Sequence, residues 1–146
     1  MGNYPGVTVE KKVGRFTHAG AAPNVVDLPG TYSLAPRSPD EMVAVDLLLG
    51  RQAEADRPDA VLCIVDAGNL ERNLYLVSQV LELGLPTVVA LNMVDVAAKR
   101  GITIDSAALS KRLNVPVVDV QAHRGIGLDR LTQTLANVHT LQPAAV

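Results

Sequence analysis

The chain has 146 residues, a formal net charge of −2 at pH 7 and a sequence pI near 5.9. Hydrophobic residues make up 48% and aromatic residues 3%, so one domain with an aliphatic core can form, and the mild acidity gives no reason to expect a nucleic acid partner. No apolar run reaches the roughly 18 residues that a membrane helix needs, and the single Cys63 suits a reducing compartment. We therefore expect a cytoplasmic chain in which Cys63 is a buried core residue.

The front of the chain favours an antiparallel hairpin. Residues 9–16 alternate imperfectly between apolar and polar side chains, and residues 24–28 form a second short β-rich run after a turn rich in alanine, glycine and proline. Pro29 and Gly30 end this run, because proline cannot extend the hydrogen-bond ladder. A helix is expected from residue 39 to Gly50, with acidic residues in its first turn.

Three apolar runs then alternate with amphipathic stretches. The runs are typical of strands buried on both faces and span residues 59–66, 86–91 and 115–120. The stretches predict helices from Leu70 to a stop at Gly84, from a cap at Asp105 to Leu113, and from Leu128 to Val138. This order predicts an α/β domain with a doubly wound, mostly parallel sheet, to which the hairpin adds one antiparallel edge. Residues 140–146 are expected to be a frayed tail.

Polar segments follow the expected strands, and in such sheets ligands bind beyond the carboxyl ends of the strands. The segments are Asp27–Gly30, Asp66–Gly68, Asn92–Asp95 and Gln121–Gly125. Each has a structural explanation when taken alone: a turn, or, for Asn92 and Asp95, a cap of the helix that follows. We interpret Asp66–Gly68 as such a strand-to-helix turn. The order and common placement of the others favour a ligand site.

The motifs in these segments resemble those of P-loop GTPases. DLPG at 27–30 resembles their D-x-x-G, NMVD at 92–95 their guanine-reading N-K-x-D, Gln121-Ala122 their S-A loop, and GVTVEKK at 6–12 their first switch. The set NYPGVTVEKK, DLPGTYSL and NMVD is similar to the G domain of the ferrous iron transport protein B family, over roughly residues 2–138. The resemblance implies a P-loop GTPase-like fold over residues 1–139. It also implies the GTP-binding and GTP-hydrolysing regulatory domain of a bacterial ferrous iron transporter, at the cytoplasmic face of the cell membrane.

The resemblance also assigns the nucleotide contacts. At the phosphate end, Thr8 is expected to bind Mg²⁺ and the γ-phosphate, Asp27 to hold Mg²⁺ through a water, and Gly30 to present its N–H to the γ-phosphate. At the base, the Asp95 carboxylate would accept from the N1–H and the 2-amino group of guanine, a donor pair that adenine lacks. Asn92 would tie the loops together, and the Ala122 N–H would donate to guanine O6.

Three positions depart from the GTPase pattern. Met93 replaces the usual lysine of N-K-x-D, a change that the iron transport family tolerates, and Gln121 replaces the usual serine. Thr31 follows DLPG where Ras-like enzymes carry the glutamine that orients water. We therefore assign no catalytic residue and expect any hydrolysis to be slow.

The phosphate-binding motif G-x-x-x-x-G-K-[ST] does not occur in the 146 residues. We therefore expect a G domain truncated at its front, without the first strand and helix of the fold, in which GTP or GDP and Mg²⁺ bind weakly or not at all. Exposed sheet edges would then favour self-association. The other partner implied is the membrane-spanning part of the parent transporter.

Two other functions are open. The chain could be a nucleotide-free interaction module that keeps the G-domain scaffold. It could also be a GTPase of RNA or ribosome maturation, although the V-E-K-K continuation after Thr8 and the lack of a basic patch argue against this.

Overall fold

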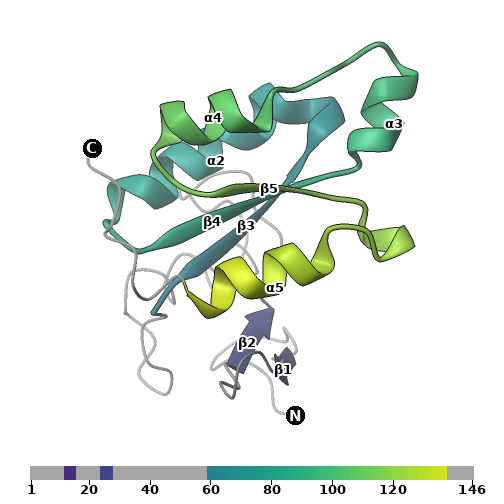
Figure 1. Ribbon diagram of the computed structural model, residues 1–146. Coiled ribbons are helices and arrows are strands. Elements are labelled where there is room, and N and C mark those ends of the chain that lie inside the picture. The colour runs from purple at the N-terminus through teal and green to yellow at the C-terminus, as the bar shows by residue number, and fades with distance from the viewer. Residues whose placement is uncertain (1–11, 16–23, 28–58, 138–146) are drawn as a thin grey trace. The chain divides into compact units, whose positions relative to one another are not determined.

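The computed structural model describes residues 12–15, 24–27 and 59–137 of the chain (Figure 1). The chain divides into two units, Met1–Pro58 and Asp59–Val146. None of the described helices is both long and apolar enough to cross a membrane.

The first unit contains an antiparallel pair of strands, β1 (Lys12–Arg15) and β2 (Asn24–Asp27). Lys12 lies opposite Asp27 and Arg15 opposite Asn24, which confirms the hairpin expected from the sequence. The outer parts of both expected strands lie outside the described residues, as does the helix expected from residue 39 to Gly50.

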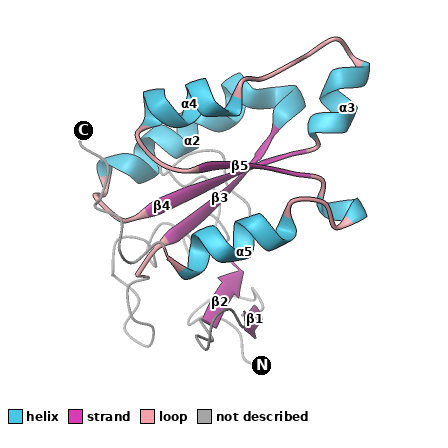
Figure 2. Cartoon of the chain, in the orientation of Figure 1, coloured by secondary structure: helices cyan, strands magenta, loops and turns pink. Residues whose placement is uncertain are grey.

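The second unit is built on a parallel sheet of β3 (Val61–Asp66), β4 (Thr87–Asn92) and β5 (Val117–Val120), in that order (Figure 2). All three strands form where the sequence predicts them. Asp66 is paired with Asn92, and Asn92 with Val120, so the carboxyl ends of the strands are level. The residues that follow these three positions therefore form one rim of the sheet.

Helices cover both faces of this sheet. They are α2 (Leu70–Glu82), α3 (Val94–Lys99), α4 (Ser106–Leu113) and α5 (Leu128–Ala136), with single 3₁₀ turns η1 (Ala67–Asn69) and η2 (Ala122–Arg124). Figure 1 shows α2 and α4 on one face and α5 on the other. The doubly wound α/β class is thus confirmed. The remainder of the expected last helix and the tail at 140–146 lie outside the described residues.

The helix ends follow local rules. The Asp105 side chain accepts a hydrogen bond from the Ala108 N–H at 3.1 Å, so Asp105 caps α4 as predicted. Gly84 follows α2 with a φ of +75°, which is the left-handed backbone that glycine adopts without strain. These local signals explain why the expected ends of α2 and α4 agree closely with the structure.

The core is aliphatic, as the composition requires. On the face of α5, Leu62 and Leu131 pack against a buried cluster of Ala90, Val118 and Val120. Cys63 is buried, as expected, and its burial raises the pKa of the thiol to about 12 because the interior disfavours the thiolate.

The expectation that residues 59–66 are buried on both faces is wrong at Ile64, which is 66% exposed, whereas its neighbour Val65 is 1% exposed. In the described sheet β3 is an outer strand that pairs with β4 alone, so one side of it has no strand neighbour there. A strand in this position does not need apolar cover at every residue.

Candidate functional site

The candidate site is the rim beyond the carboxyl ends of β3, β4 and β5. The sequence places NMVD directly at the end of β4, and Gln121-Ala122 directly after β5. Because the two strands are parallel neighbours in register, these two loops lie beside each other. The common placement that the sequence predicts for them is confirmed.

A hydrogen bond joins the two loops. Asn92 Oδ1 accepts from the backbone N–H of Ala122 at 3.2 Å, across 30 residues of sequence. Asn92 does not cap α3, whose first flanking residue is Met93 and which has no side-chain cap. The alternative in which Asn92 is only a helix cap is therefore wrong, and its amide holds the loop after β5 against the loop after β4.

Met93 turns the chain from β4 into α3 with a left-handed backbone, φ 62° and ψ 33°. This conformation costs a residue with a side chain roughly 1–2 kcal/mol, and strain of this kind gathers at functional sites. Asn114, the other described non-glycine residue with positive φ, is a common type at such a helix end. No such residue preference explains the left-handed backbone of Met93.

Asp95 lies in the first turn of α3, where its negative charge suits the helix dipole. Its side chain is 18% exposed, and Oδ2 lies 3.5 Å from His123 Nε2. Oδ1 is buried and has no hydrogen-bond partner in the described part of the chain. A buried acceptor without a hydrogen bond costs about 1–3 kcal/mol. The position of Asp95 Oδ1 therefore suits a hydrogen-bond donor from a ligand.

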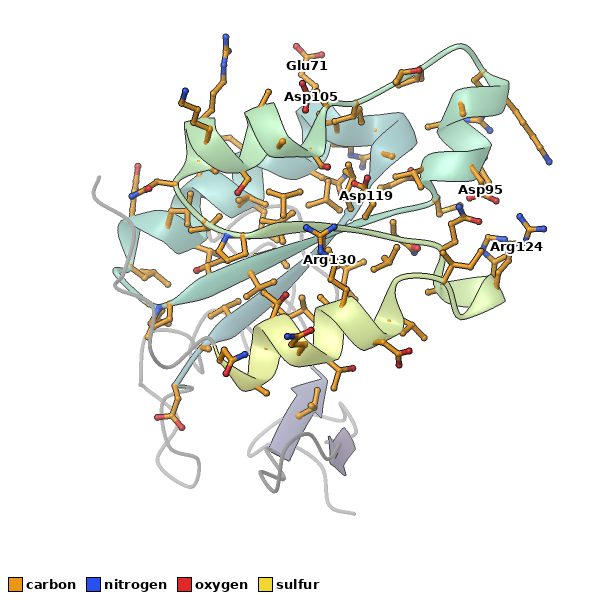
Figure 3. All side chains as sticks on the ribbon, viewed as in Figure 1. Glu71, Asp95, Asp105, Asp119, Arg124 and Arg130 are labelled. Atoms are coloured by element: carbon orange, nitrogen blue, oxygen red, sulfur yellow. The ribbon has the colours of Figure 1, made fainter. Side chains whose placement is uncertain are left out.

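The loop after β5 is a tight, internally bonded turn. Gln121 exchanges two backbone hydrogen bonds with Ile126, at 2.9 and 3.2 Å, and Gly125 closes η2 with a left-handed backbone. The Arg124 guanidinium donates to Gln121 Oε1 at 3.4 Å. Figure 3 shows Arg124 and Asp95 at the same end of the domain. The turn therefore presents residues 122–124 toward α3 from a fixed backbone.

Gly127 anchors this turn to the sheet. It precedes α5 with a φ of +83°, and a Cβ at this position would collide with the backbone carbonyl oxygen of Asp119 on β5. Only glycine permits both the backbone conformation and the close approach.

Asp66 serves the turn after β3. Its Oδ1 accepts from the Gly68 N–H at 2.8 Å and its Oδ2 from the Asn69 amide at 3.0 Å, so both carboxylate oxygens are satisfied within four residues. The interpretation of Asp66–Gly68 as a strand-to-helix turn is confirmed. The contrast with Asp95, which has an orphaned oxygen, separates a structural carboxylate from a candidate ligand group.

Of the three residues predicted to contact the phosphates and Mg²⁺, the structure describes one. Asp27 is the last residue of β2, and Thr8 and Gly30 lie outside the described residues. Within the described segments, no group of three histidine, cysteine or acidic side chains could hold a metal ion. The Mg²⁺ assignment stays a prediction.

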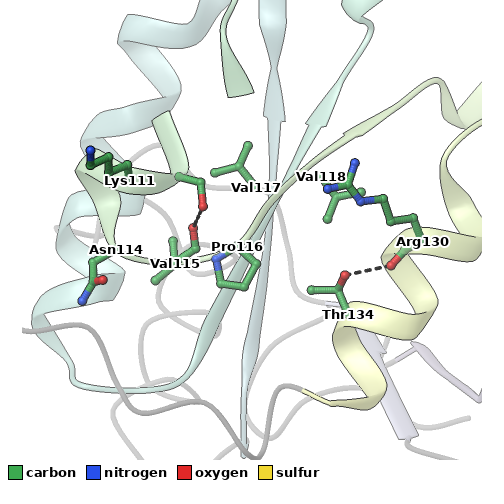
Figure 4. Close-up of a pocket in the computed structure, with 9 residues that line it drawn as sticks. Lys111, Asn114, Val115, Pro116, Val117, Val118, Arg130 and Thr134 are labelled. Carbon is green, nitrogen blue, oxygen red and sulfur yellow. Dashed lines mark hydrogen bonds between the residues drawn. The ribbon is translucent and has the colours of Figure 1, made fainter. Parts of the chain in front are cut away.

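A separate groove of about 490 Å³ lies between α4, β5 and α5 and is lined in part by Lys111, Pro116 and Arg130 (Figure 4). Two hydroxyl groups that line the groove donate hydrogen bonds to nearby backbone atoms: Ser110 to the Val115 carbonyl and Thr134 to the Arg130 carbonyl. The groove is open, and it includes the residues just before β5, at the opposite end of the strand from the rim. We do not assign it to the site.

No role was predicted from the sequence for His123, which the structure places at this site. Its one sequence signal is its position directly after Ala122. The contact with Asp95 joins residues 28 positions apart, and no local pattern predicts it.

A parallel α/β sheet with NMVD and Gln121-Ala122 joined at its rim defines a domain of the P-loop GTPase class. The chain resembles the cytosolic domain of FeoB from L. pneumophila, with a TM-score of 0.88 and 44% identity over 98% of this chain and 58% of that one. The cytosolic domain of the T. maritima FeoB iron transporter in its GMPPNP form gives a TM-score of 0.87 and 39% identity, over 99% of this chain and 56% of that one.

The family comparison is equally clear. A family model described as ferrous iron transport protein B matches residues 1–135. The chain is also 50% identical over 139 residues to an Fe(2+) transport protein A/Fe(2+) transporter FeoB fusion protein of Porphyromonas gingivalis, covering 95% of this chain and 16% of that protein. The chain belongs to the ferrous iron transport protein B family. It spans about a sixth of the length of that relative.

Proposed function

We propose that this chain is the guanine-nucleotide-binding regulatory domain of a ferrous iron transporter, acting on the cytosolic side of the membrane. The family, the fold and the names of the solved relatives, which are cytosolic domains, support this. One of these relatives is described in its GMPPNP form, and GMPPNP is a GTP analogue. We propose residues 1–139 as one G domain, with the membrane-spanning part of the transporter as its partner.

The observation that carries the proposal is the orphaned Asp95 Oδ1 beside the Asn92–Ala122 bridge. The N1–H and 2-amino groups of guanine form a donor pair that matches the two oxygens of a carboxylate. Adenine has no such pair, so Asp95 would select guanine. Met93, two residues before Asp95, and Gln121, directly before Ala122, would border the base.

Ala122 would complete the base site. Its N–H donates to Asn92 in the structure, and in the proposed complex the same N–H would turn toward guanine O6 or be shared between the two acceptors. The internal bonds of the turn that Gln121 begins keep this N–H near β4 in either case.

At the other end of the nucleotide we propose Thr8, Asp27 and Gly30 as the phosphate and switch residues, with Thr8 and Asp27 serving Mg²⁺. When bound, Mg²⁺ neutralises phosphate charge. Thr8 would order only when a triphosphate is bound, which is how such switches report the nucleotide state, and Gly30 would present its backbone N–H to the γ-phosphate.

Hydrolysis, if the chain performs it, is proposed to be slow. The residue after DLPG is Thr31, whose hydroxyl is too short to replace the water-orienting glutamine of Ras-like enzymes.

The test compares nucleotides on the 146-residue chain with and without Asp95→Asn. Titration to millimolar GDP, ADP and xanthosine diphosphate, followed by NMR shifts of the rim amides, should show GDP preferred by the unmodified chain. Asparagine can donate to the 2-oxo group of xanthine, so the variant should prefer xanthosine diphosphate. Asp105→Ala, which removes a carboxylate that caps α4, is the matched control and should keep the GDP preference.

No selective binding of GDP would overturn the proposal. In that case the interaction module is the better description, because the fold would remain while the rim recognised no base.

A further inference from the structure

The Asp95 carboxylate, which the proposed function assigns to guanine, already has a neighbour. His123 Nε2 lies 3.5 Å from Asp95 Oδ2, and the other carboxylate oxygen is shielded from solvent. Guanine would need both oxygens. His123 therefore lies at an oxygen that the base would also use, and the two would compete for it or share it.

The backbone of η2 holds His123 in this position. Ala122, the residue before it, is bonded to Asn92, and Gly125 N–H donates to the Ala122 carbonyl at 3.2 Å. The His123 side chain itself is 56% exposed, so its ring can rotate into solvent without disturbing the core. The backbone of the turn is thus held in place, whereas the imidazole ring can move toward or away from Asp95.

The effect of His123 depends on the charged side chains near it. Asp95 on α3 is its ion-pair partner. Arg124, the next residue in η2, carries a permanent positive charge and donates to Gln121. Within the described part of the chain, no ion pair joins His123 to Asp129 of α5. The carboxylate that His123 contacts there is thus the one that guanine would use.

We propose that His123 lowers the guanine-nucleotide affinity of this domain by competing with the base for Asp95. This inference rests on the proposed function. A bound guanine must displace the imidazole from Asp95 Oδ2 or share that oxygen with it, so the contact of the free chain is lost or weakened in the complex. Removal of the His123 side chain therefore raises the affinity for guanine nucleotide.

The test measures the dissociation constant of GDP at a single pH for the 146-residue chain and for His123→Ala. His123→Ala should bind GDP about twofold to fivefold more tightly than the unmodified chain, because an exposed ion pair contributes little. His139→Ala, the same substitution at another histidine, should keep the affinity of the unmodified chain.

Each result has one meaning. If the unmodified chain and His123→Ala bind GDP equally, or the variant binds it more weakly, the role of His123 is wrong and the proposed function stands. If His139→Ala gains the same affinity, the effect is not specific to His123 and the inference is again wrong. If neither the unmodified chain nor His123→Ala binds GDP, the proposed function fails and this inference fails with it. NMR spectra of each variant establish that it is folded.

Discussion

Asn92 and Ala122 are joined by a hydrogen bond of 3.2 Å between a side-chain carbonyl and a backbone N–H, which links the loops after β4 and β5. Both loops start from parallel strands in register, so the bond needs no long side chain to span the gap. It converts two separate loops into one surface that carries Asp95, Gln121 and His123.

Asn92→Ala tests this link. Loss of the bond should lower the free energy of unfolding by about 0.5–1.5 kcal/mol and weaken GDP binding, because the Ala122 N–H is no longer held in place. Urea denaturation and NMR titration measure the two effects. Asn137→Ala is the matched control, since the Asn137 side chain donates to the Gln133 carbonyl at the C-terminal end of α5. Equal loss of GDP affinity in both variants would contradict the role of Asn92.

Gly127→Ala should be the more damaging of two glycine substitutions. Gly127 and Gly84 both have positive φ, but a Cβ at Gly84 meets nothing within 4 Å, whereas one at Gly127 meets the backbone of β5. We expect Gly84→Ala to cost roughly 1–2 kcal/mol from the backbone conformation. Gly127→Ala should cost about 2–4 kcal/mol and displace η2. Thermal unfolding and the amide shifts of residues 121–126 measure this, and equal costs would show that the close approach to Asp119 is unimportant.

Ile64 and Val65 are neighbours on β3 with opposite exposure, 66% and 1%. Val65→Ala should destabilise the chain by about 1.5–3 kcal/mol, because a fully buried side chain loses its packing. Ile64→Ala should change stability by less than about 1 kcal/mol. Denaturant unfolding of the two variants checks this. A larger effect at Ile64 would mean that apolar surface covers it.

Cys63 makes stability fall at alkaline pH. Burial raises the pKa of its thiol to about 12, above the value of about 8.5 for an exposed thiol. Between these values the unfolded chain has lost the proton and the folded chain has kept it. The free energy of unfolding therefore falls by about 1.4 kcal/mol per pH unit in this range. It is unaffected below the exposed value.

Cys63→Ala should lack this component. Urea unfolding at about pH 8 and pH 10 of both proteins isolates it from the titration of tyrosine and lysine, which the two proteins share. A parallel decline in the two proteins would contradict the burial of the thiol.

The order of strands and helices in the second unit follows from short-range physics. Apolar runs with polar ends predicted β3, β4 and β5, since a strand covered by helices needs nearly continuous apolar residues. Asp105 and Gly84 marked helix ends, because a cap or a left-handed turn is a property of a few consecutive residues. The family resemblance rested on motifs that are likewise contiguous, such as NMVD at 92–95.

Residues far apart in the chain obey a different rule, because their contacts depend on which strands pair and in what register. Sequence alone left Asn92 as either a helix cap or a bridge, and the parallel pairing of β4 with β5 decided for the bridge. The exposure of Ile64 depends on the outer position of β3 in the described sheet, which its own apolar run cannot report.

The sequence by itself determined the α/β class, the family motifs and the identity of Asp95 as the base-reading candidate, because these are encoded in contiguous residue patterns. The tertiary structure alone decided that one Asp95 oxygen is orphaned and that His123 lies against the other. Burial and pairing of a side chain are set by what the fold brings around it, and here the fold brings together two loops from different strands.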